Sequence, residues 1–111
     1  MKMSHDECKF LHEAATEAAI LACKEEEDNN PNDWFPCGFA WVKISPATQP
    51  FGRFLKKEGI VDRAAWDGGY DVWNPAGSST QRMLSKSAGA RAYAGILEAH
   101  GVKCYSASRM D

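Results

Sequence analysis

Apolar residues recur with a helical period in three segments of the chain. Between residues 5 and 26 an apolar stripe runs from Phe10 to Leu21 at the three- and four-residue spacing of an amphipathic helix. The same spacing appears over residues 50–58, and again in a segment that starts near residue 80 or, more cleanly, at 85 and ends at 100. Glycine follows the last two segments, as it commonly does at helix ends. The pattern therefore predicts three helices.

Strand-like segments lie between these helices and after the last one. Cys37–Ile44 is rich in β-branched and aromatic residues and is bracketed by turn-forming residues. Shorter segments of this kind cover residues 70–73 and 102–107. The resulting order, α-β-α-β-α-β, predicts a single α+β domain over residues 1–111, with helices packed on a small three-stranded sheet. Parallel and antiparallel pairing are both open at this stage.

The first predicted helix is separated from the rest of the domain, residues 37–111, by a polar segment. Residues 28–36 combine asparagine, aspartate and proline, a composition typical of a linker. The helix itself carries a stripe of alanines, which favours close packing on another surface. We expect the two later helices on one face of the sheet, and this helix on the other face or against a second copy of the chain.

The alternation of side chains along the strands predicts what the two faces of the sheet carry. Ala40, Val42 and Ile44 share one face and are ordinary core residues. The opposite face combines aromatic and charged side chains from all three strands: Phe39, Trp41, Lys43, Asp71, Trp73, Lys103 and Tyr105.

Two interpretations of this aromatic face are open. An exposed sheet face with aromatic rings and lysines is typical of modules that hold single-stranded nucleic acid, where bases stack on the rings. Large aromatic side chains are more often buried, however. That tendency favours a face covered by the first helix or by a second subunit.

Composition and charge narrow the class of partner. The 111 residues carry a formal net charge of −2, and the isoelectric point is about 5.9. Such a chain has no general electrostatic attraction to nucleic acid, so the sequence favours a protein partner over nucleic acid. No apolar run is long enough to span a bilayer, and the N-terminus lacks the apolar region of a signal peptide, so we expect no membrane partner.

The cysteines indicate a reducing compartment and suggest one weak metal hypothesis. The four cysteines form no CxxC pair, which favours reduced thiols and a cytoplasmic location. His5, Cys8 and His12 fall on one helical face and are competent zinc ligands, with Cys23 or a carboxylate as a fourth. One such triplet is weak support, so no metal or cofactor is expected, and whether the triplet binds a metal is left open.

The sequence contains no complete catalytic motif. Cys37 and His100 are the candidates for an activated thiolate, with Arg109 as a ligand-binding residue. A basic set, consisting of Arg82, Lys86, Arg91 and Arg109, is either a phosphate-binding group or a solvated surface. A small enzyme is therefore an alternative and not the first hypothesis.

Several separated motifs resemble a family of small, functionally uncharacterised bacteriophage proteins. The resemblance covers residues 36–111, whereas the first helix and the linker match less closely. It rests on these segments: Cys37–Val42, Phe54–Lys57, Gly68-Gly69, Trp73–Pro75, Gln81, Ala88–Ala94 and Tyr105–Asp111 with its serine-arginine-x-aspartate ending. The resemblance implies a phage or prophage protein acting in the bacterial cytoplasm, and it implies no catalytic residues.

These observations lead to one expected function and two alternatives. We expect a phage accessory protein that binds a host protein or nucleic acid. The predicted site residues are Trp41, Lys43, Trp73, Lys103, Tyr105 and Arg109. The alternatives are a small enzyme or ligand-binding protein that uses Cys37, His100 and Arg109, and a structural homodimer without a ligand.

Overall fold

The computed structural model describes residues 3–29, 37–61, 68–78 and 82–110. Its elements are α1 (His5–Asn29), β1 (Gly38–Ile44), α2 (Pro50–Lys57), β2 (Tyr70–Trp73), α3 (Met83–Ala99) and β3 (Cys104–Met110). The α+β class and the order of elements are confirmed. Several boundaries differ from the predicted ones: α1 continues through the start of the predicted linker, α3 begins at Met83, and β3 begins at Cys104 and continues to Met110.

The sheet has the strand order β2-β1-β3, and both pairs are antiparallel. The middle strand, β1, supplies the most deeply buried residues of the inner face, Val42 and Ile44. They pack in the core with Tyr93 and Leu97 from α3. This arrangement settles the pairing that the sequence left open.

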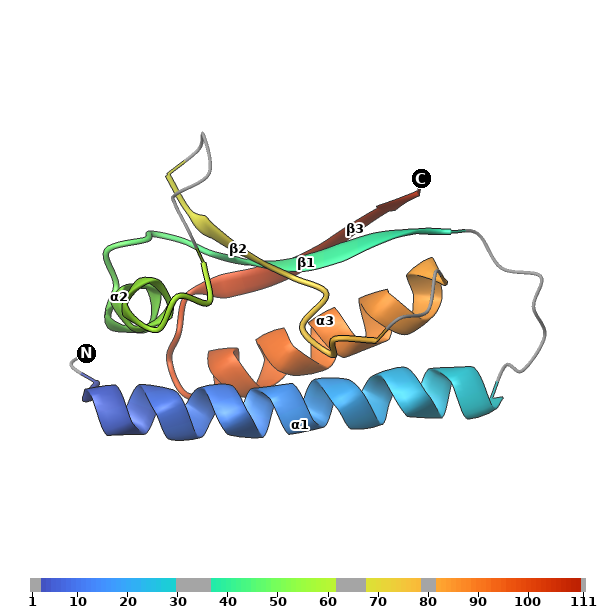
Figure 1. Cartoon of the computed structure of the whole chain (residues 1–111), viewed down its shortest axis with the longest axis horizontal. Helices are drawn as coiled ribbons and strands as arrows, with labels where there is room; N and C mark the ends of the chain where they lie inside the picture. Colours follow the sequence, from blue (N-terminus) through green and yellow to red (C-terminus); the bar gives the residue numbers. More distant parts are fainter. Residues whose placement is uncertain (1–2, 30–36, 62–67, 79–81, 111) are drawn as a thin grey trace.

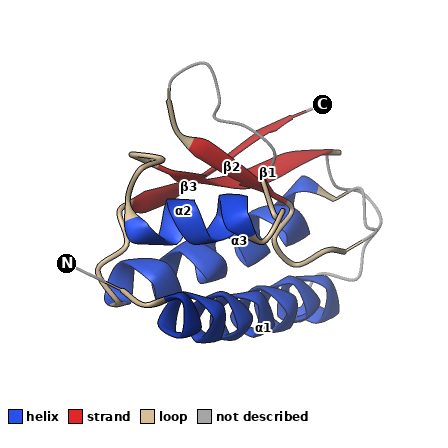
Figure 2. Cartoon of the chain, turned by 60° about the vertical axis from the view of Figure 1, so that its left-hand side comes forward, coloured by secondary structure: helices blue, strands red, loops and turns tan. Residues whose placement is uncertain are grey.

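The helices all lie on one side of the sheet. Helix α3 packs under the inner face, and α1 packs on α3 on the side that faces away from the sheet (Figure 1). Helix α2 lies on the same side, at the end of the sheet near the start of α1, which it contacts (Figure 2). The expectation that the N-terminal helix covers the opposite sheet face is therefore wrong for this chain.

The close contact between α1 and α3 explains this placement. The buried stripe of α1 consists of small side chains and one leucine: Cys8, Leu11, Ala15, Ala19 and Cys23. Opposite them, α3 has Gly89, where an added Cβ would lie only 3.2 Å from the carbonyl oxygen of Ala19. Small residues on both helices let the two backbones approach, so α1 buries its stripe on a helix instead of on the sheet.

Local hydrogen bonds fix where the helices begin and end. Helix α1 begins with a capping box, in which the Glu7 amide donates to Ser4 Oγ (3.1 Å) and the Ser4 amide donates to Glu7 Oε1 (3.3 Å). After α2 and α3, Gly59 and Gly101 adopt φ values of +73° and +85°. These are the left-handed C′ glycines that the sequence predicts.

Candidate nucleic-acid interface

The outer face of the sheet is the candidate site. It is made by the side chains on the side of the sheet that faces away from the helices: Phe39, Trp41, Lys43, Asp71, Trp73, Tyr105, Ala107 and Arg109. The register aligns them in rows across the strands, because Trp41 lies opposite both Trp73 and Ala107, and Phe39 lies opposite Arg109. The alternation of side chains along the predicted strands therefore assigned these aromatic residues to the correct face.

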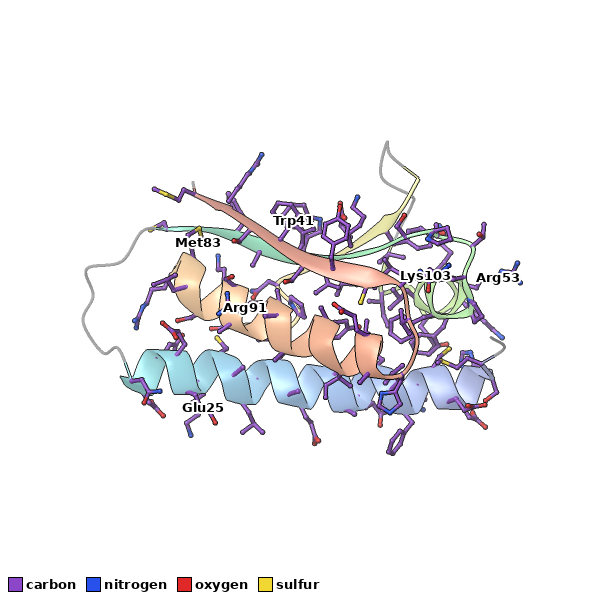
Figure 3. All side chains as sticks on the ribbon, turned by 180° about the vertical axis from the view of Figure 1, so that it is seen from behind. Glu25, Trp41, Arg53, Met83, Arg91 and Lys103 are labelled. Carbon is purple, nitrogen blue, oxygen red and sulfur yellow. The ribbon has the colours of Figure 1, made fainter. Side chains whose placement is uncertain are left out.

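Three of the four aromatic side chains of the outer face are exposed. Trp73 and Tyr105 expose 54% and 53% of their surface and Phe39 exposes 39%, while Trp41 is half-buried. Seen from behind, Trp41 projects from the sheet on the side opposite α3 and α1 (Figure 3). The expectation that these aromatics belong to a core is therefore wrong for Trp73 and Tyr105, since all three described helices pack on the inner side.

Trp41 and Trp73 form a cross-strand pair. Their ring centroids lie 4.9 Å apart with an interplanar angle of 37°. The Asn74 amide donates to the carbonyl of Ala40 (2.9 Å), so the neighbouring tryptophans occupy a non-hydrogen-bonded position, where cross-strand side chains are closest. Ala107 lies on the other side of Trp41 and has only a methyl group, which leaves that flank of the indole open.

Lys43 does not act as a free cation on the outer face. Its Nζ lies 2.9 Å from Asp71 Oδ1, and both side chains are largely buried. The antiparallel register brings the two residues opposite each other. The pair therefore leaves the centre of the face electrically neutral, and the predicted role of Lys43 in holding an anionic ligand loses its structural basis.

Exposed Arg109 lies at one end of the outer face, whereas Lys86 reaches the same end from α3 and is buried. Arg109 places its guanidinium carbon 5.7 Å from the centroid of the Phe39 ring, and Lys86 Nζ lies 5.6 Å from the same centroid. Lys86 also donates to the carbonyl of Gly38 (3.0 Å). At the other end, exposed Lys103 precedes β3, and its backbone amide and carbonyl bond the side chain of Gln49.

Charge is distributed unequally between α1 and the rest of the chain. Of the 15 acidic and 13 basic residues in the chain, α1 holds eight acidic and two basic ones. Seven acidic and eleven basic residues therefore remain outside α1, a balance of +4 against −6 in the helix. Because α1 lies on the far side of α3, the negative charge is concentrated away from the outer face (Figure 1).

The candidate catalytic residues do not come together. Cys37 precedes β1 at the end where Gly38 pairs with Met110, whereas His100 precedes β3 at the end where Ile44 pairs with Cys104. The length of β1 separates them, about 20 Å for a seven-residue strand. His100 Nδ1 lies 2.9 Å from the carbonyl of Ile96, and Cys37 is the exposed cysteine among the four. The structure therefore provides no Cys37–His100 pair.

The two histidines of the metal hypothesis have separate partners, and Cys8 is buried. His5 Nε2 lies 3.3 Å from Glu58 Oε2, and His12 Nδ1 lies 2.7 Å from the Tyr93 hydroxyl. Burial lowers the pKa of His12, although nearby Glu13 partly opposes this, and burial together with Glu7 raises the pKa of Cys8. Among the described residues no three metal-ligating side chains gather.

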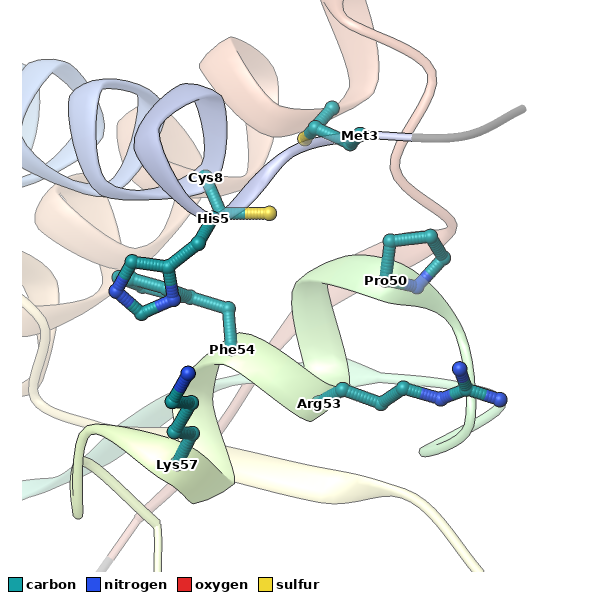
Figure 4. A pocket seen from close by; sticks show the side chains of 7 residues that line it. All are labelled: Met3, His5, Cys8, Pro50, Arg53, Phe54 and Lys57. Atoms are coloured by element: carbon teal, nitrogen blue, oxygen red, sulfur yellow. The ribbon is translucent and has the colours of Figure 1, made fainter.

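A separate groove of about 420 Å³ lies between the start of α1 and α2. Figure 4 shows its lining, which combines His5, Arg53 and Lys57 with the apolar side chains of Met3, Pro50 and Phe54, and with Cys8. In this view Arg53 extends away from the imidazole while Lys57 points toward it. The cations do not converge on one point, so the groove is a weaker candidate than the outer face.

Comparisons with family models, curated proteins and solved structures gave no match. None of the helices in the described part of the chain has the length and apolar character needed to cross a membrane. The candidate site therefore rests on its geometry alone.

Proposed function

We propose that this protein is a binding module that holds single-stranded nucleic acid on the outer face. The observation that carries the proposal is the exposure of Trp73 and Tyr105, both more than half exposed on a sheet face that the described helices leave open. Exposed aromatic side chains that gather on one surface mark interaction sites in folded proteins. The contact between Trp73 and Trp41 contributes to stability, but it leaves more than half of the Trp73 surface exposed.

The shape of the face suits stacked bases. Aromatic side chains on the exposed face of an antiparallel sheet hold about two or three unstacked bases in known modules of this kind. The indole of Trp73 and the phenol of Tyr105 offer two such surfaces, and Ala107 leaves access to Trp41 between them. Each stacked base contributes about 1–3 kcal/mol to binding.

The charge distribution favours nucleic acid over a protein partner. The net charge of −2 favoured a protein partner in the sequence analysis. However, α1 alone has a charge of −6 and lies on the far side of α3 from the sheet, so the rest of the chain is positively charged. Arg109 is exposed at one end of the face, and Lys103 is exposed just before β3 near the other end, so both cations are accessible to phosphates. A partner protein is the alternative outcome of the test below.

The resemblance to small bacteriophage proteins is the basis for the proposed origin and location of the protein. A phage-encoded module with this face would act on single-stranded DNA or RNA in the host cytoplasm. The proposal assigns it no catalytic step.

Fluorescence anisotropy with labelled single-stranded DNA and RNA of about ten nucleotides tests the proposal. We expect binding that weakens with salt, and a loss of affinity for Trp73→Ala that is absent for Leu21→Ala. Leu21 is a matched control, since it is a large apolar residue, 62% exposed, on the outer side of α1. Arg109→Ala should lower the slope of log affinity against log salt by about 0.7, the value for one contact to a single strand.

Absence of binding to either oligonucleotide would refute the nucleic-acid proposal. The same result would follow if Trp73→Ala and Leu21→Ala weakened binding equally. A purified host protein that bound the wild type and not Trp73→Ala, in the absence of oligonucleotide binding, would instead identify the outer face as a protein interface.

A further inference from the structure

The two edges of the sheet differ in how far they are protected. Strand β2 has four residues and ends at Asn74, which adopts φ +44°, followed by Pro75. Strand β3 has seven residues with no proline, of which four are exposed and none is buried. Folded proteins usually shorten, bend or cover their edge strands, because an open edge pairs with other chains. By this criterion β2 is protected and β3 is not.

The hydrogen-bond pattern shows which groups of β3 face outward. The Ser45 amide donates to the carbonyl of Lys103 (3.3 Å), so odd-numbered residues of this segment direct their backbone groups toward β1. The amides and carbonyls of Ser106 and Ser108 therefore point to the open edge. Among the described residues no strand pairs with β3 on that side.

We infer that the open edge of β3 pairs with the β3 edge of a second copy of this chain. An antiparallel pair of identical strands is self-complementary, so one two-fold axis satisfies both edges. This inference goes beyond the proposed function and does not depend on it.

The side chains of β3 select one register for this pairing. With the two-fold axis at Ala107, all seven residues pair, and Tyr105 faces the partner's Arg109 on the outer face, a favourable cation–π arrangement. With the axis at Ser106, Lys103 faces the partner's Arg109, which places like charges opposite each other. With the axis at Ser108, only residues 106–110 pair. The register centred on Ala107 is therefore preferred.

The dimer would form one six-stranded sheet. Because the two-fold axis is perpendicular to the sheet, both outer faces lie on the same side and all helices lie on the other. Tyr105 and Arg109 of each subunit would then sit in the middle of a doubled aromatic platform.

Light scattering on the full chain gives the first test. We expect a mass twice the 12.2 kDa of one chain for the wild type and for Ser108→Ala, and a single-chain mass for Ser108→Pro. Proline removes an amide that has no strand partner within one subunit, and it is tolerated on edge strands. A monomeric wild type at all accessible concentrations would overturn the inference, and so would a dimeric Ser108→Pro variant that retains the wild-type circular dichroism spectrum.

Cross-linking tests the register independently. In a Cys37→Ser background, Ala107→Cys should form an intermolecular disulfide on mild oxidation, because Cα atoms in a non-hydrogen-bonded pair lie about 4.5 Å apart, within disulfide range. The matched control is Ser108→Cys in the same background. Its two thiols would be diagonal neighbours about 7–8 Å apart between Cα atoms, beyond easy reach. Equal cross-linking of the two variants, or none for Ala107→Cys, would contradict the proposed register.

Discussion

The two faces of the sheet come from the same strands and differ in how deeply their side chains are buried. On the inner face, Val42 and Ile44 are completely buried beneath α3. On the outer face, Trp73 and Tyr105, which are larger and equally apolar over most of their surface, are more than half exposed. Burial of the inner residues stabilises the fold, whereas exposure of the outer rings brings no such benefit. This contrast is the basis for the proposal that the outer face binds a ligand.

The largest effect is expected on the inner face. Ile44→Ala should lower the free energy of unfolding by about 2–5 kcal/mol, because it removes buried methyl groups and leaves a cavity. Urea denaturation of wild type and variant measures this difference. A loss below about 1 kcal/mol would mean that the inner face is not the tightly packed side of the sheet.

A smaller loss of stability is expected at Gly38, which lies close to Met83 of α3 and Arg109 of β3. An added Cβ at Gly38 would lie 2.8 Å from Met83 Cγ, and closer still to the carbonyl oxygen of Arg109. Gly38→Ala should therefore lower the free energy of unfolding by about 1–3 kcal/mol through overpacking. Gly95→Ala is the matched control, since an added Cβ there meets no atom within 4 Å, and it should be neutral or stabilising.

Substitution on the outer face should separate stability from binding. Trp73→Ala should lower the free energy of unfolding by only about 0.5–1.5 kcal/mol, the contribution of its contact with Trp41. The same change should weaken binding of single-stranded oligonucleotide by about 1–3 kcal/mol, which corresponds to roughly 5- to 150-fold. Denaturation and anisotropy on one preparation measure both quantities. Loss of stability comparable to that of Ile44→Ala would place Trp73 in the core.

The smallest effect concerns His12, a half-buried residue of α1 whose Nδ1 lies 2.7 Å from the Tyr93 hydroxyl. Burial lowers the pKa of His12 below its ordinary value of 6.5, so the unfolded chain binds a proton more readily than the folded chain. Stability from the neutral imidazole is therefore complete above about pH 6.5 and declines as pH falls from there through the folded-state pKa. His12→Gln should reduce this decline. Denaturation from pH 7.5 to 5 tests it, and an unchanged slope would argue against a buried neutral His12.

Much of the fold was predictable because local patterns determine it. Helical spacing, glycine C′ residues and strand alternation are properties of neighbouring residues, and they correctly predicted three helices, three strands and the face to which each aromatic residue belongs. The end of β3 was predicted too early, since Ser108 and Arg109 have no strong strand preference and become ordered by pairing with β1.

The site was less predictable because it depends on contacts between distant segments. The position of α1 follows from close packing on Gly89, which no local pattern shows. The pairing of Lys43 with Asp71 depends on the register of two strands, and it removes a cation that the sequence had assigned to ligand binding. Likewise, net charge could not show that the acidic residues are concentrated on a helix behind the sheet.

Tryptophan fluorescence of a variant in which Trp73 is the only tryptophan tests both whether the outer face is exposed and whether it binds single-stranded oligonucleotide. Trp34→Phe, Trp41→Phe and Trp66→Phe would leave Trp73 as the only tryptophan and would keep an aromatic ring at position 41 beside it. We predict red-shifted emission that acrylamide quenches readily, followed by a change in emission and protection from acrylamide when single-stranded oligonucleotide is added. Blue-shifted emission that resists acrylamide in the free protein, and that oligonucleotide does not alter, would contradict an exposed binding face.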